Sequence, residues 1–187
     1  MGWIPLGVLA VVVFLIIGIY NSLVRLKVQS ENAWADIDVQ LKRRHDLVPN
    51  LVDTVKGYAG HEKQTLEAVI AARNRAMAAA TPAAKGEAEG ILAQSLKSLF
   101  ALAEAYPQLR AVESFTQLQG SLNQIEEAVQ NARRYYNAVV RDLNTKIQEF
   151  PSNFIANFFS FKPREFFEIA EAAERTVPKV SFEQTAR

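Results

Sequence analysis

The sequence has no cysteine and only two histidines among its 187 residues. Without cysteine there is no disulfide, no thiolate zinc site, no cysteine-ligated iron–sulfur cluster and no cysteine nucleophile. The 21 Lys and Arg residues nearly balance the 20 Asp and Glu residues, so the formal net charge is only +1. A protein that binds nucleic acid by neutralising many phosphates needs a stronger basic field, and we therefore expect no nucleic-acid partner.

Motifs for metal and phosphate chemistry are missing as well. The segment from His61 to Thr65 begins like the HExxH zinc motif, but Thr65 stands where the second histidine would be. Neither His45 nor His61 follows a glutamate by three residues, as the ligand pairs of a di-iron bundle require. The patterns GxxxxGK[ST], GxGxxG and GxSxG do not occur. We expect no catalytic residue, no metal site and no cofactor.

Charge is also missing from the first 24 residues, and every charged side chain lies from Arg25 onward. The apolar run from Trp3 to Tyr20 approaches the length of roughly 20 residues that spans a hydrocarbon core of about 30 Å. A cleaved signal peptide would have a basic start, a shorter apolar run and a small-residue cleavage site, and none of these is evident. We predict an uncleaved transmembrane anchor over residues 1–24, with Trp3 and Tyr20 near the headgroup layers.

Basic residues lie on one side of this anchor only. None precedes it, and five follow within about 20 residues of its end: Arg25, Lys27, Lys42, Arg43 and Arg44. The positive-inside rule therefore predicts an outside N-terminus and a cytoplasmic domain.

The rest of the chain shows helical periodicity and no sustained alternation of period two. The anchor is predicted to continue into a first helix that ends before Pro49, followed by helices over about 51–80, 87–106 and 112–150. We predict an all-α fold, in which the transmembrane helix continues into an antiparallel bundle of about four long helices with short C-terminal helices. The bundle domain is placed at residues 25–174 and a polar tail at 175–187.

Polar and charged residues occur on or beside the apolar faces of these helices. A buried charge is costly unless it is paired, so such residues should find partners. A catalytic or ion-binding carboxylate centre is one interpretation, and a salt-bridge network that fixes helix register is the one we favour. The network predicted from these faces comprises Glu62, Arg73, Glu104, Glu126, Arg133 and Asn137, and Asn144 lies beside the same faces.

Phenylalanine is concentrated near the C-terminus, at positions 150, 154, 158, 159, 161, 166 and 167. Core packing at one end of the bundle is the favoured interpretation. The alternative is an amphipathic face on the membrane or on another subunit, which the neighbouring Lys162 and Arg164 keep open. The candidate membrane or subunit interface residues are Trp3, Tyr20, Phe154, Phe158, Phe159 and Phe161.

Several blocks of this sequence resemble the LemA family. They include the RRxDLxPNL pattern at 43–51, the ARxxYN pattern at 132–137, EAYP at 104–107, FTQLQGSL at 115–122 and Phe150-Pro151. One departure is Leu143, which stands where an aromatic residue usually precedes the asparagine. The resemblance implies a single N-terminal transmembrane helix, a mostly helical domain and a bacterial inner-membrane protein. It carries over no catalytic residue, and a similar protein is implicated in forming membrane compartments. Of the matched residues, Arg43, Arg44 and Asp46 lie where the first helix is predicted to end, and we add them to the predicted polar network as a junction between that helix and the bundle.

These observations lead to the hypothesis of a non-enzymatic, single-pass membrane scaffold that self-associates through its helical domain and organises or shapes the bacterial membrane. Its expected partners are the lipid bilayer and further copies of the chain. The alternative is an adaptor or binding module for another membrane protein, such as a membrane protease or sensor. An enzyme that uses the interior carboxylates and arginines is the least favoured hypothesis.

Overall fold

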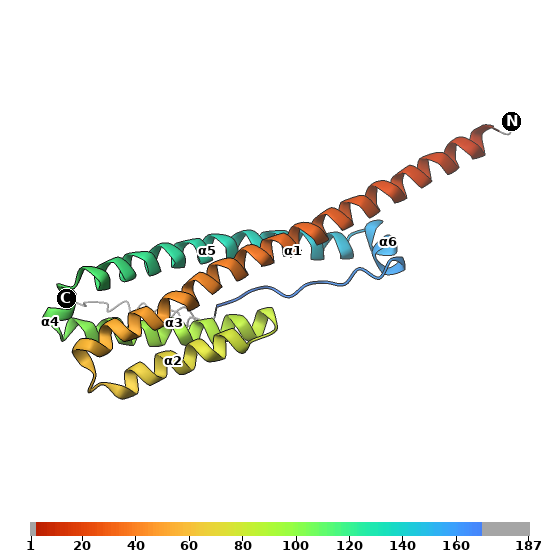
Figure 1. Cartoon of the computed structure of the whole chain (residues 1–187). Helices are drawn as coiled ribbons and strands as arrows, with labels where there is room; N and C mark the ends of the chain where they lie inside the picture. Colours follow the sequence, from red (N-terminus) through yellow and green to blue (C-terminus); the bar gives the residue numbers. More distant parts are fainter. Residues whose placement is uncertain (1–2, 170–187) are drawn as a thin grey trace, which may run out of the picture.

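The computed structural model describes residues 3–169 of the chain, and within that range it is all-helical, without a strand (Figure 1). Its six helices are α1 (Trp3–Ala59), α2 (Lys63–Ala78), α3 (Pro82–Glu104), α4 (Pro107–Arg110), α5 (Glu113–Gln148) and α6 (Ser152–Phe158). The all-α bundle with a long apolar N-terminal helix is thereby confirmed. The predicted polar tail lies outside the described residues, as does the end of the predicted bundle domain.

The longest helix, α1, has two parts of different character. Its N-terminal part is apolar and exposed, and no other part of residues 3–169 covers its most apolar window. From Leu23 onward, buried residues recur every three or four positions, which is the spacing of a helix that packs on one side. Among residues 3–169, α1 is the only helix long and apolar enough to cross a membrane.

The prediction that the first helix ends before Pro49 is wrong. α1 continues through Pro49 to Ala59, and the chain turns at residues 60–62 instead. Proline removes one backbone hydrogen bond from a helix, but buried Val48 and Leu51 on either side hold this stretch in the core. Packing therefore outweighs the local preference for a break.

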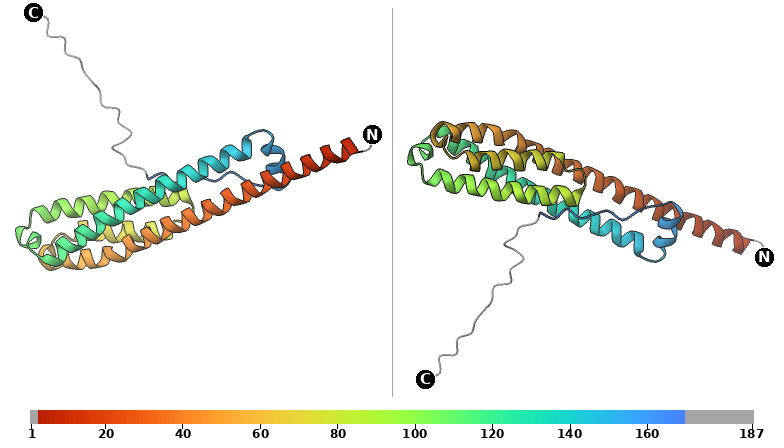
Figure 2. Two further views of the ribbon diagram at one scale, coloured as in Figure 1. Left: turned by 90° about the horizontal axis from the view of Figure 1, so that it is seen from above. Right: turned by 90° about the horizontal axis from the view of Figure 1, so that it is seen from below.

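The helices form an elongated bundle (Figures 1 and 2). α5 runs antiparallel to α1 along much of its length, and the α2–α3 hairpin packs at the end far from the N-terminus. The N-terminal part of α1 projects beyond all the other helices (Figure 1). Apolar side chains form one large core cluster where α1 to α5 meet and two smaller ones between α1 and α5, nearer the apolar end.

After α5 the chain forms one short helix, α6, where one or two were predicted. Residues 161–169, here called the extended segment, have no regular secondary structure. The extended segment returns along α1 and α5 (Figure 1), and its Phe167 is fully buried against Trp34 and Tyr136. The segment reaches the start of α3, where a side chain at Gly86 would overlap the carbonyl of Glu168.

Candidate membrane-proximal site

A buried cluster of charged side chains joins three helices near the middle of the bundle. Arg44 of α1 pairs with Glu89 of α3 at 3.3 Å and with Glu126 of α5 at 3.1 Å. Nε2 of His45 lies 2.6 Å from the other carboxylate oxygen of Glu89. The Glu89 side chain is 0% exposed and that of Arg44 is 5% exposed. The attraction between the two charges therefore has to offset the free-energy cost of removing both from water. These contacts link α1, α3 and α5 through charged side chains inside the bundle.

A fourth helix joins the cluster through a backbone atom. Nε of Arg73, on α2, donates a hydrogen bond of 2.7 Å to the carbonyl oxygen of His45. In a regular helix this carbonyl would accept from the N–H of residue 49, but Pro49 has none. Arg73 thus supplies the donor that the proline removes. The block at 43–51 therefore contacts Arg73 of α2 at this point.

The structure brings together only part of the predicted polar network. Arg44, Arg73 and Glu126 belong to the cluster, whereas Arg43, Asp46, Glu62 and Glu104 are exposed. Arg133 is half-buried and has no ion pair or side-chain hydrogen bond within residues 3–169. His45 and Glu89 were missed, although Glu89 shares a helical spacing with Leu92 and Leu96. In the part of the chain described, no three His, Asp or Glu side chains are placed to hold a metal.

Two asparagines of α5 hold the extended segment in place. Asn144 accepts from the backbone N–H of Arg164 at 2.8 Å and donates to its carbonyl at 2.9 Å. Asn137 makes the same pair of bonds to Phe167, at 2.9 and 3.0 Å. Each amide therefore satisfies both backbone groups of one residue, as a neighbouring strand would. This explains why the segment is extended without belonging to a sheet.

Tyr136 adds a third bond to the extended segment. Its hydroxyl donates to the carbonyl oxygen of Glu165 at 2.9 Å. Burial raises the pKa of Tyr136 above its ordinary value of 10.0, and the nearby Arg164 opposes this effect in part. The hydroxyl therefore remains protonated at neutral pH and available as a donor.

At the other end of the extended segment, α6 packs against the end of the apolar part of α1. Leu23 of α1 lies in a buried cluster with Leu143, Ile147 and Ala156, the last from α6. The ring of Tyr20 lies 4.7 Å from that of Phe159 and 6.0 Å from that of Phe161, centroid to centroid. α6 therefore sits beside the boundary where the uncharged stretch of α1 ends.

Most of the C-terminal phenylalanines are exposed. The favoured prediction of core packing holds for Phe167 and partly for Phe161, and it is wrong for Phe150, Phe154, Phe158, Phe159 and Phe166. Phe154 is 64% exposed and Phe158 is 81% exposed. Ser152 and Ala156 occupy the inner face of α6, so the phenylalanines fall on the outer face. Trp3 and Tyr20 are exposed on α1 as well.

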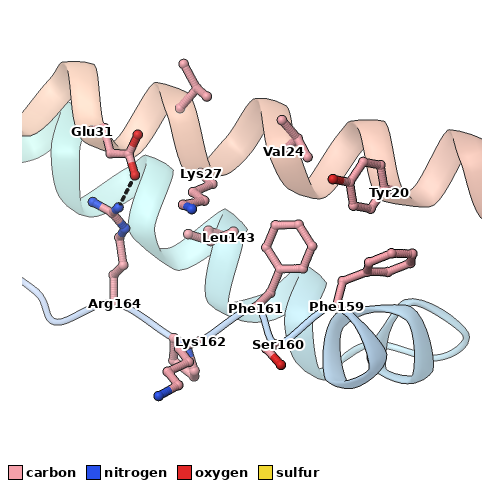
Figure 3. Close-up of a pocket in the computed structure, with 12 residues that line it drawn as sticks. Tyr20, Val24, Lys27, Glu31, Leu143, Phe159, Ser160, Phe161, Lys162 and Arg164 are labelled. Carbon is pink, nitrogen blue, oxygen red and sulfur yellow. Dashed lines mark hydrogen bonds and ion pairs between the residues drawn. The ribbon is translucent and has the colours of Figure 1, made fainter.

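A groove of about 600 Å³ separates α1 from the chain that follows α6 (Figure 3). On the α1 side it is lined by Tyr20, Val24, Lys27, Val28 and Glu31, and on the other side by residues 159–164, with Leu143 of α5 between them. Arg164 pairs with Glu31 at 2.6 Å at one end of the groove (Figure 3). Lys27 and Lys162 have no ion pair within residues 3–169. The groove thus combines apolar walls with the amino group of Lys27, whereas the amino group of Lys162 points to the far side of the segment (Figure 3).

Comparison with known proteins places these features in a family. The family model of the LemA family matches residues 33–182. Two relatives from Paramagnetospirillum magneticum, named magnetosome proteins MamQ 1 and MamQ 2, are each 23% identical over 200 residues, covering 92% of this chain and 74% of the relative. A protein LemA from Metamycoplasma hominis is 24% identical over 162 residues, covering 84% of this chain and 73% of the relative.

Proposed function

Since the chain belongs to the LemA family, we propose that it is a single-pass membrane scaffold without enzymatic activity. In this proposal residues 1–24 anchor the chain in the bacterial membrane, and the helical domain self-associates to organise or shape that membrane. Two relatives named magnetosome proteins support a role in organising a bacterial subcellular structure.

The observation that carries this proposal is the continuity of α1. A helix of 57 residues is about 85 Å long, and no linker interrupts it between the apolar part and the bundle. Leu23, at this junction, is fully buried against α5 and α6. In this proposal the anchor and the bundle therefore move as one body, which holds the domain at a set angle to the membrane.

A fixed angle favours association between neighbouring copies. Domains that are anchored in two dimensions and oriented alike present the same side surfaces to one another. Contacts that are weak in solution then act at a high effective concentration and are amplified by multivalency. This is the physical basis for a scaffold that needs no chemistry of its own.

The mass of the full-length protein, reconstituted in lipid nanodiscs and diluted in detergent, tests self-association. We expect oligomers whose proportion rises with protein concentration. A protein that remained monomeric over a wide range of concentrations in both environments would contradict the scaffold.

An adaptor for another membrane protein is the second candidate, favoured by exposed apolar side chains on the hairpin far from the anchor. Ile70 and Met77 of α2 and Ile91 of α3 are exposed. Crosslinking in native membranes distinguishes the two functions. A ladder of self-linked species supports the scaffold, whereas one foreign partner at a fixed ratio supports the adaptor.

The same proposal places the bundle in the cytoplasm, because the basic residues follow the anchor. The absence of cysteine allows a direct test with a single Met77→Cys variant. We expect a membrane-impermeant maleimide to label this variant only after the cells are lysed. Labelling of intact cells would place the bundle on the outer side.

A further inference from the structure

We propose that α6 and the adjacent groove form a binding site for anionic phospholipid. In this site the outer face of α6 lies in the interfacial layer of the leaflet next to the bundle, and the groove binds the lipid phosphate. The inference rests on the membrane anchor of the proposed function, and it adds a second contact with the bilayer and a preference for lipid charge.

The depth of α6 follows from its contacts with α1. Tyr20 ends the apolar run and Arg25 is the first charged residue, so the hydrocarbon region gives way to headgroups between them. α6 packs at this level, because its Ala156 lies in one cluster with Leu23 and Phe159 contacts Tyr20. When α1 crosses a bilayer, α6 is therefore brought to the membrane surface.

The exposed face of α6 is suited to that surface. Phe154 and Phe158 are four residues apart on its outer face, and Phe150 and Phe159 flank them, all exposed. Aromatic side chains on one face of a short helix are typical of segments that lie in the plane of the interface. The occupant of this face is the bilayer, because α6 packs beside the end of the apolar run of α1, through Ala156 against Leu23 and Phe159 against Tyr20.

The charges of the groove supply the preference for anionic lipid. Glu31 neutralises Arg164, whereas Lys27 and Lys162 lack an ionic partner in the described part of the chain. Lys27 can bind the lipid phosphate from within the groove, and Lys162, whose amino group points to the far side of the segment, adds positive charge at the same level (Figure 3). Val24, Leu143 and Phe161 offer apolar contacts to the adjoining part of the lipid. Two lysines without an ionic partner in residues 3–169, at the level of the headgroups, favour an anionic lipid over a second copy of the chain as the occupant.

Site-directed spin labelling of the full-length protein tests the position of α6. Single-cysteine variants Val12→Cys, Phe158→Cys and Met77→Cys report on the anchor, on α6 and on the far end of the bundle. In nanodiscs of phosphatidylcholine and phosphatidylglycerol, we expect labels at positions 12 and 158 to be accessible to oxygen and protected from a water-soluble nickel chelate. The label at position 77 should show the opposite pattern.

The outcomes separate the two proposals. If the label at position 12 lies in lipid and the label at position 158 lies in water, the proposed lipid site at α6 is wrong, but the proposed membrane anchor is supported. A label at position 158 protected from both reagents shows that protein covers α6, which also overturns the lipid assignment. A label at position 12 in water contradicts the anchor, and with it the proposed function.

Lipid selectivity tests the two lysines. The variant Lys27→Gln/Lys162→Gln is compared with Lys63→Gln/Lys97→Gln, which removes the same charge from exposed positions on α2 and α3. Native mass spectrometry of protein released from mixed nanodiscs should show a several-fold enrichment of phosphatidylglycerol for the unmodified protein and for the control. The groove variant should lose this enrichment. Equal retention by all three proteins, equal loss in both variants, or no enrichment at all would overturn the assignment.

Discussion

At the scale of single residues, the environment of Pro49 shows how a sequence feature that weakens a helix is offset from elsewhere in the fold. The proline leaves the carbonyl of His45 without its helical donor, and Arg73 from another helix replaces it at 2.7 Å. A buried carbonyl without a partner would be destabilising. The arginine therefore allows α1 to remain one helix.

This arrangement predicts a coupling between Arg73 and Pro49. Arg73→Ala should destabilise the protein by about 1–2 kcal/mol, because it leaves the His45 carbonyl without this donor. In a Pro49→Ala background the same substitution should cost about 1 kcal/mol less, because residue 49 then donates from its own N–H. Thermal or denaturant unfolding of the four proteins, followed by circular dichroism in detergent, gives the coupling. Additive effects would show that Arg73 does not compensate for the proline.

The charged cluster shows what can be predicted at this scale. Helical periodicity placed Arg73 and Glu126 beside apolar faces, and both join the cluster. Arg43, Arg44 and Asp46 were included because they lie in the block that resembles the LemA family, and of these three only Arg44 is buried, since neighbouring positions on a helix differ by about 100°. Glu89 was overlooked because a lone acidic residue in a helix is ordinarily exposed.

At the scale of elements, the extended segment is the part of the fold that periodicity could not predict. Helices and strands can be predicted from the period at which apolar residues recur, but the backbone of this segment is hydrogen-bonded to side chains of α5 and has no such period. Asn137 and Asn144 are ordinary helix residues in the sequence, and only the fold shows that they bind the same segment. The phenylalanine cluster was misjudged for the same reason, since buried Phe167 belongs to the extended segment, whereas four of the five exposed phenylalanines lie in α6 or directly beside it.

Removal of the two amides should release the extended segment. In the variant Asn137→Ala/Asn144→Ala, we expect faster hydrogen exchange at the backbone amides of Arg164 and Phe167, with a loss of stability of about 1 kcal/mol per asparagine. Asn131→Ala is the matched control, because this asparagine is exposed on the same helix and bonds only locally. Exchange at both amides that matched the unmodified protein would contradict the clamping role.

At the scale of the whole molecule, the protein is an elongated bundle built onto its own apolar helix. The long apolar first helix and the antiparallel bundle could be predicted, because hydropathy and period 3.6 persist over long stretches. The position of the first turn could not, because Pro49 is a local signal that the surrounding core overrides.

A flexible insertion at the junction should uncouple the two parts. Four Gly and Ser residues placed between Asn21 and Ser22 interrupt α1 just before buried Leu23. In nanodisc images, we expect a narrow range of angles between bundle and bilayer for the unmodified protein and a broad range for the insertion. The same insertion between Thr81 and Pro82, in the α2–α3 turn, should leave the angle unchanged. A broad range in the unmodified protein would show that α1 does not transmit orientation.

The spacing of the two asparagine clamps sets where α6 ends up. Seven residues of α5 advance about 10.5 Å, and three residues of extended chain advance about 10 Å, so Asn137 and Asn144 match Phe167 and Arg164 in only one register. The five residues from Phe159 to Pro163 then connect α6 to Arg164, where Asn144 binds the segment. The positions of Asn137 and Asn144 on α5 therefore determine where α6 lies along α1, and with it the exposed phenylalanines beside the end of the apolar part of α1.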